Sequence, residues 1–273
     1  MATENSRKRG AGQSPWRLGV VSYLNARPLI CGLERESAVR LDFDVPSRLT
    51  ARLLGGDFDA ALVPVVDLLR HNNELQIVSD ACIGCDGDTL TVRVFSKVPP
   101  TDVRRIHLDL DSHTSVILAR LIWPALYKQD VSFVRLEDAA SLEQCESVLL
   151  IGDKVVSISP DEFRYQVDLG SAWKTWTGLP FVFAVWAAAR SRDTRSLADV
   201  LVAARDRGVR KAGPLAIEYG PGHGWPAALA QQYLERYLTF GLTDKHVEGM
   251  ICFFDRATAG GLVPEAHELQ VVP

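Results

Sequence analysis

The chain has 273 residues, a formal net charge of −4 and a sequence pI near 5.9. Its composition, 47% hydrophobic and 23% charged, is that of an ordinary globular protein, which can fold without a metal or a disulfide. An acidic chain without a broad basic region is poorly suited to bind nucleic acid, so we expect no such partner.

Residues 1–15 are polar, with a short basic group at Arg7–Arg9, and we expect a disordered tail. A secretion signal needs an apolar stretch of about 7–15 residues after such a group, and none follows here. The longest strongly apolar run, Leu179–Ala189, is shorter than the roughly 20 residues that span a bilayer. We therefore expect a cytoplasmic protein with no membrane partner.

The five cysteines do not indicate a metal site. Cys82 and Cys85 form a single CxxC, whereas zinc needs a second cysteine pair or histidines at ligand spacing. The six histidines are scattered. Glycine-rich phosphate loops and dinucleotide fingerprints are also absent from the sequence. We expect ordinary thiols, no metal and no cofactor.

Short apolar runs alternate with helical patterns in the first part of the chain. The expected strands are Arg17–Val21, Val39–Val45 and Phe58–Val63, and the expected helices begin at Pro28, Pro46 and Pro64. Proline is well tolerated in the first turn of a helix, where its missing N–H costs nothing. This strand–helix rhythm predicts a mainly parallel sheet covered by helices on both faces.

The rhythm stops and restarts near a long expected strand at Thr89–Ser96. Three further strands follow, at Arg105–Leu110, Val131–Val134 and Ser147–Ile151. A second long apolar run, Phe181–Ala189, is expected to cross back. The pattern therefore predicts an α/β protein of two lobes joined by two crossings, with residues 16–96 plus 188–273 in the first lobe and 97–187 in the second.

In open α/β sheets, ligands bind at the carboxyl ends of strands, and in a two-lobed molecule these ends face the cleft. The expected turns at this edge are Ser22–Asn25, Val45–Ser47, Val63–Pro64, Asp111–Ser115 and Gly152–Asp153. Each precedes a helix, whose N-terminus offers N–H groups and a partial positive charge. We therefore expect the cleft to hold a small anion.

Several of these candidates have an alternative structural role. Ser112, Thr114 and Ser115 offer hydroxyl donors to a carboxylate, but any one of them could simply cap the helix. For Ser47 and Asn25, considered alone, the cap is the stronger interpretation.

Two further interpretations stay open. Asp153 at a strand end could accept a hydroxyl proton, act as a base, or cap a helix. Thr89, Thr91 and Arg93 alternate along one strand and so share a face. If that face looks into the cleft, Thr91 and Arg93 contact the ligand; otherwise they form a solvated edge.

Five segments, in order, resemble the motifs of the chorismate dehydratases of the futalosine route to menaquinone. They are Val21–Leu29, Asp44–Leu49, Thr114–Val116, Leu149–Lys154 and Trp173–Ala184. The resemblance spans roughly residues 16–270. It implies the fold of type 2 periplasmic solute-binding proteins, with two lobes and a hinge of two crossings. It also implies a hydro-lyase, monomeric or homodimeric, that converts chorismate to 3-[(1-carboxyvinyl)oxy]benzoate without a cofactor.

The resemblance also assigns roles. The asparagine of the Tyr-Leu-Asn motif is Asn25, which it places at the reacting end of the site, beside Ser22 and Tyr23. The small hydroxyl residue before the first crossing, usually serine in the family, is Thr91 here, and Arg93 replaces an expected aliphatic residue. Residues 61–64 also depart from a serine-containing pattern. A substrate carboxylate could serve as the base.

Two other functions are compatible with such a fold. One is a non-catalytic cytoplasmic binding protein for a small carboxylate, which chorismate would stabilise without being converted. The other is the sister enzyme of the same pathway, which acts on a dehypoxanthine futalosine. The Tyr23–Asn25 motif and the run Trp176–Phe181 favour the dehydratase.

Overall fold

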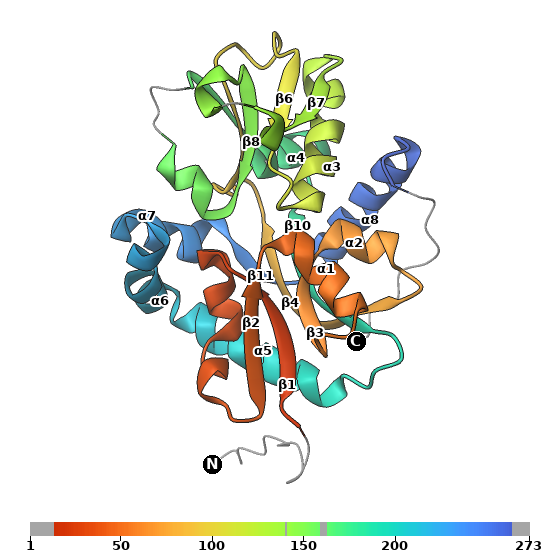
Figure 1. Cartoon of the computed structure of the whole chain (residues 1–273), viewed down its shortest axis with the longest axis vertical. Helices are drawn as coiled ribbons and strands as arrows, with labels where there is room; N and C mark the ends of the chain where they lie inside the picture. The colour runs from red at the N-terminus through yellow and green to blue at the C-terminus, as the bar shows by residue number, and fades with distance from the viewer. Residues whose placement is uncertain (1–13, 140, 159–162, 264–273) are drawn as a thin grey trace.

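The computed structural model describes residues 14–139, 141–158 and 163–263. Of the tail expected over residues 1–15, residues 1–13 lie outside the described residues. The first lobe is built on a sheet of β1 (Trp16–Val21), β2 (Val39–Asp44), β3 (Ala60–Pro64), β4 (Leu75–Cys85), β10 (Phe181–Ala189) and β11 (Thr239–Gly241). The second lobe is built on β5 (Val92–Ser96), β6 (Arg105–Leu108), β7 (Ser132–Arg135), β8 (Ser147–Ile151) and β9 (Tyr165–Asp168). Figure 1 shows the two lobes one above the other.

Helices cover both sheets. The α-helices are α1 (Pro46–Leu54), α2 (Val65–Arg70), α3 (His113–Ile122), α4 (Leu169–Thr177), α5 (Arg195–Arg210), α6 (Ala212–Tyr219), α7 (Ala227–Gln232) and α8 (Asp244–Ala259). Shorter 3₁₀ or π segments are η1 (Leu24–Ile30), η2 (Leu33–Arg35), η3 (Trp123–Tyr127), η4 (Leu136–Asp138), η5 (Leu142–Gln144), η6 (Gly152–Ser157), η7 (Pro221–His223) and η8 (Tyr233–Tyr237). In Figure 1, α3 and α4 belong to the upper lobe, and α1, α2 and α5 to the lower one.

The expected βα units supply the parallel part of each sheet. In the described residues, the strand order is β11-β4-β10-β3-β1-β2 in one sheet and β7-β6-β8-β5-β9 in the other. β1 runs parallel to β2 and β3, and β6 runs parallel to β7 and β8. The antiparallel pairs involve β10 with β3 and β4, β11 with β4, and β5 with β8 and β9.

The points where the chain changes lobe differ from the expected boundaries after residues 96 and 187. β5 pairs with β8 and β9, so it is a full member of the second sheet. β10 pairs with β3 and β4, so it belongs to the first. The crossings therefore lie in the short turns at residues 86–91 and 178–180, because strands bonded on both edges cannot also bridge two sheets.

The local sequence explains how the helices begin and end. Pro46 starts α1, and the helix stops before Gly56, whose φ of +83° favours glycine. The Asp168 carboxylate caps α4 by accepting the N–H groups of Gly170 and Ser171. Within the ranges that the structure covers, no helix is long and apolar enough to cross a membrane.

Gly208 lies where α5 packs against η1. A Cβ at this position would lie 1.9 Å from the Pro28 carbonyl oxygen, a backbone atom that cannot move aside easily. We expect Gly208→Ala to lower the free energy of unfolding by about 1–3 kcal/mol, because overpacking forces the two helices apart. Urea unfolding measures this loss.

The matched control is Gly222→Ala, because a Cβ there would meet no atom of the described chain within 4 Å. The control should change the free energy of unfolding by less than about 0.5 kcal/mol. Equal effects of the two substitutions would show that the contact between α5 and η1 is not tight.

Candidate active site

A cavity lies between the two lobes. Its volume is about 40 Å³, and about 490 Å³ is free of protein atoms when its open mouth is included. The residues that line it are Val21, Tyr23, Asn25, Pro46, Pro64, Ile83, Thr89, Thr91, Val92, Ser112, Ser115, Ile151, Gly152, Phe183, Ala184, Tyr233 and Leu238. Val21, Pro64 and Ile151 end β1, β3 and β8, so the cavity lies at the strand edge where ligands of α/β folds bind.

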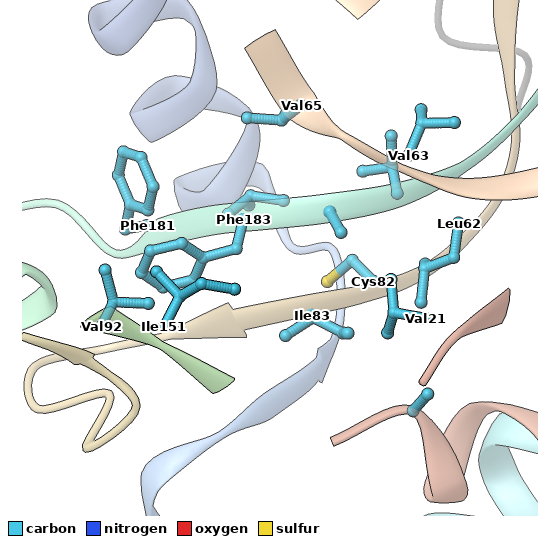
Figure 2. Close-up of a cluster of buried hydrophobic side chains, with 14 of the residues drawn as sticks. Val21, Leu62, Val63, Val65, Cys82, Ile83, Val92, Ile151, Phe181 and Phe183 are labelled. Carbon is cyan, nitrogen blue, oxygen red and sulfur yellow. The ribbon is translucent and has the colours of Figure 1, made fainter. Parts of the chain in front are cut away.

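One wall of the cavity is apolar and is made by both lobes. Val92 of β5 and Ile151 of β8 lie beside Phe183 of β10, as Figure 2 shows, and Phe181 lies next to them. The rings of Phe181 and Phe183 meet edge to face at 4.7 Å between centroids. Such a wall can hold the flat face of an unsaturated ring and exclude water.

Polar groups occupy other parts of the lining. The Oδ1 atom of Asn25 is buried and has no hydrogen-bond partner in the described part of the chain. The Oγ1 atom of Thr91 lies 2.7 Å from the hydroxyl oxygen of Tyr233. The hydroxyl oxygens of Ser112 and Ser115 lie 2.9 Å apart, and Ser112 also caps α3 by accepting the N–H of Ser115. A ligand can therefore meet one unpaired acceptor and several hydroxyls.

The lining carries no full charge: among its described residues there is no Asp, Glu, His, Lys or Arg. Its titratable side chains are Tyr23 and Tyr233, and burial raises the pKa of both phenols. Positive potential comes instead from the starts of α1, α2 and α3, which bring Pro46, Pro64 and Ser112 to the cavity. An anion would be bound here by dipoles and hydroxyls.

Hydrogen bonds hold the lobes together around the cavity. The N–H of Ser47 donates to the Asp111 carbonyl over 2.9 Å. Thr114 accepts the N–H of Val66 and donates to the Phe183 carbonyl, each over 3.3 Å. These contacts join the starts of α1 and α2 in the first lobe to the turn before α3 and its first residues in the second. The structure is therefore a closed form of the cleft.

An acid–base pair adds to this closure. Nδ1 of His113 in α3 lies 2.8 Å from the carboxylate of Asp67 in α2, which also accepts the Thr50 hydroxyl. Burial raises the pKa of Asp67, but its hydrogen bond to His113 and the neighbouring charges outweigh this effect and leave the pKa below its usual value.

Asp153 forms a second contact across the cleft. Its carboxylate accepts the backbone N–H of Leu24 at 3.2 Å and the indole N–H of Trp225 at 2.8 Å, and Nδ1 of His223 lies 2.7 Å away. Burial raises the pKa of Asp153, while the bonds from Trp225 and His223 act in the opposite direction. All its close partners belong to the first lobe, so Asp153 fixes the lobes relative to one another.

The structure brings together about half of the residues expected at the site. Those in the cavity lining are Tyr23, Asn25, Thr91, Ser112 and Ser115. The remaining ones lie outside the lining. Ser22 is exposed, and Ser47, Thr114 and Asp153 make the contacts described above.

Arg93 lies outside the cavity lining and is partly buried rather than solvated. Its guanidinium pairs with Asp168 at 3.3 Å and with Gln166 at 3.0 Å, outside the cavity. Leu90, two residues before β5, has a φ of +64°, and its N–H is held by the Asp168 carboxylate. The chain turns sharply there, and Thr91 lines the cavity while Arg93 contacts Gln166 and Asp168 of the neighbouring strand β9.

Tyr233 and Phe183 line the cavity but were not expected there from the sequence. Tyr233 lies 142 positions after its partner Thr91, and no local pattern marks it.

Tyr23 is anchored by its ring against Gly152 and by its hydroxyl, which donates to Asp111 at 3.3 Å.

The described residues do not bring metal ligands together. Within residues 14–139, 141–158 and 163–263, no group of three or more His, Cys, Asp or Glu side chains could hold a metal ion. Cys82 and Cys85 are buried in β4, and burial raises the pKa of both thiols. Both are therefore neutral near pH 7.

The fold is that of the periplasmic binding proteins. A protein from Archaeoglobus fulgidus superposes with a TM-score of 0.74 at 14% identity, over 91% of this chain and 98% of that one. The alkanesulfonate-binding protein from Xanthomonas axonopodis pv. citri superposes with a TM-score of 0.66 at 13% identity, over 93% and 95%. The periplasmic aliphatic sulphonate binding protein from Escherichia coli gives 0.64 at 15% identity, over 93% and 95%.

The sequence identifies the family within this fold. A family model described as menaquinone biosynthesis matches residues 16–259. The chorismate dehydratase of Thermus thermophilus is 30% identical over 241 residues, which are 81% of this chain and 87% of that one. The chain belongs to the chorismate dehydratase family of menaquinone biosynthesis, which confirms the resemblance seen in the five sequence segments.

Proposed function

We propose that the protein removes water from chorismate to give 3-[(1-carboxyvinyl)oxy]benzoate, as a hydro-lyase of the futalosine route to menaquinone. The single observation that carries the proposal is the Oδ1 atom of Asn25, a residue that lines the cavity together with Thr91: this atom is buried and has no hydrogen-bond partner in the described chain. Buried polar atoms are normally paired, so an unpaired one at a cavity indicates a ligand group.

The reaction needs little from the protein besides binding and orientation. The ring hydroxyl of chorismate leaves with its C–O bond electrons, and the neighbouring ring carbon loses a proton, so the products are water and an aromatic ring. Aromaticity supplies the driving force. The apolar wall made by Val92, Ile151 and Phe183 suits the ring and keeps water out.

The polar groups then have separate roles. Asn25 accepts a hydrogen bond from the ring hydroxyl and orients it, and Thr91 donates to the departing oxygen. Ser112, Ser115 and the start of α3 bind a substrate carboxylate. Because the described lining holds no carboxylate or imidazole, a carboxylate of the substrate itself takes the ring proton.

The test is to mix purified protein with chorismate and follow the loss of diene absorbance and the appearance of the aromatic acid by chromatography. Turnover is expected. Thermal stabilisation by chorismate without product would favour a binding protein for small carboxylates. Turnover of a dehypoxanthine futalosine, with none of chorismate, would favour the sister enzyme.

A further inference from the structure

Tyr233 has a buried phenol that lines the cavity, and it has no role in the reaction proposed above. It begins the π segment η8 and is 1% exposed. Its ring stacks on Trp225, with centroids 4.5 Å apart and planes 15° apart. Its hydroxyl contacts both polar groups to which the proposed function gives roles, Thr91 at 2.7 Å and the side chain of Asn25.

The directions of these hydrogen bonds follow from the chemistry of the groups. Asn25 can meet the phenol oxygen only through its amide N–H, because its Oδ1 has no partner within the described ranges. The phenol has one proton, and Thr91 Oγ1 is the acceptor in reach of it. The Thr91 proton is then left over, since its other contact, the Thr89 carbonyl, is distant at 3.5 Å.

We propose that Tyr233 is a positioning residue that turns the acceptor of Asn25 and the donor of Thr91 toward the substrate. This inference rests on the proposed function and deepens it. A primary amide can flip and a hydroxyl can rotate, so without the phenol each group could present the wrong atom. One hydroxyl, accepting from Asn25 and donating to Thr91, fixes both.

The phenol is itself held in place from the other side. Trp225, on which it stacks, donates its indole N–H to Asp153, the residue that joins the two lobes. Asn25 and Tyr233 belong to the first lobe, whereas Thr91 ends the crossing into the second. The contact between Tyr233 and Thr91 therefore joins the first lobe to the end of the crossing.

The test is Tyr233→Phe, which removes the hydroxyl and keeps the stacked ring. We expect kcat for chorismate to fall by about tenfold or more with KM changed by less than about threefold, because substrate still binds but meets misoriented groups. Tyr237→Phe is the control, since Tyr237 lies in the same π segment outside the cavity. It should match the wild type. An unchanged kcat for Tyr233→Phe would overturn the inference.

A double-mutant cycle tests whether Tyr233 acts through Thr91. Thr91→Val should lower kcat, whereas Thr91→Ser, which keeps the hydroxyl, should stay within about threefold of the wild type. The double variant combines Thr91→Val with Tyr233→Phe. Its fold-decrease in kcat should be at least about threefold smaller than the product of the two single fold-decreases. Fully multiplicative losses would contradict the inference.

The outcomes separate the two proposals. A wild type that does not convert chorismate removes the proposed function and this inference with it. An active wild type with a fully active Tyr233→Phe variant removes the inference alone. If Tyr233→Phe does not fold, the two Thr91 variants provide the test. Equal activity of Thr91→Val and Thr91→Ser would show that the Thr91 hydroxyl is not needed, so Tyr233 would have no hydroxyl to position and the inference would be overturned.

Discussion

Replacement of Asn25 by alanine is expected to lower kcat/KM for chorismate by at least about tenfold. The loss should reach about 10²-fold if the amide stabilises the transition state as strongly as a typical preorganised polar group does. The substitution removes the buried Oδ1, which has no partner in the described chain, and the N–H that binds Tyr233. The free energy of unfolding should change little. The substitution loses the bond from the Asn25 N–H to Tyr233, but it also removes a buried oxygen that has no partner in the described chain, and the two effects offset each other. Steady-state kinetics and thermal melting measure the two effects.

The matched control is Asn73→Ala, at an exposed position in the turn between α2 and β4, away from the cavity. Its kinetics should equal those of the wild type. An Asn25→Ala variant that keeps full activity and folds normally would show that the Asn25 amide does not contact the reacting part of the substrate.

Asp153→Ala should produce the largest loss of stability, about 3 kcal/mol or more in the free energy of unfolding. The substitution leaves the N–H groups of Leu24 and Trp225 and the ring of His223 without their shared acceptor in a buried position. Because these bonds join the lobes, KM for chorismate should change as well. Urea unfolding and steady-state kinetics provide the measurements.

Asp199→Ala serves as the control for Asp153. Asp199 is an exposed carboxylate of α5 and makes no ion pair or side-chain hydrogen bond with the rest of the described chain. Its loss should cost less than about 0.5 kcal/mol. Similar unfolding curves for the two variants would mean that the contacts of Asp153 are replaced by water when the side chain is removed.

Much of the fold was predictable because its signals are local. β10 occupies Phe181–Ala189, the bounds expected from the apolar run, and α1 begins at Pro46 as expected. The fold class and the family were confirmed. The position of the cavity at the carboxyl ends of β1, β3 and β8 also agrees with the expectation from the strand–helix order.

The missed features depend on contacts distant in sequence. β4 is eleven residues long, but Ser79, Asp80 and Gly84 interrupt its apolar pattern, and its pairing with β10 and β11 stabilises it. Asp153 was expected to contact substrate, but its partners at the cleft lie about 70 to 130 positions away. Tyr233 was missed for the same reason. Such side chains acquire their roles only when the lobes meet.

The closed cleft has a consequence for affinity. The contacts of Ser47 with Asp111 and of His113 with Asp67 join the two lobes, so a substrate that enters by opening the cleft must break them. The apparent dissociation constant therefore equals the intrinsic one divided by the fraction of molecules that are open. Residues such as His113, outside the cavity lining, can thus tune how much substrate the protein needs without altering the groups that contact it.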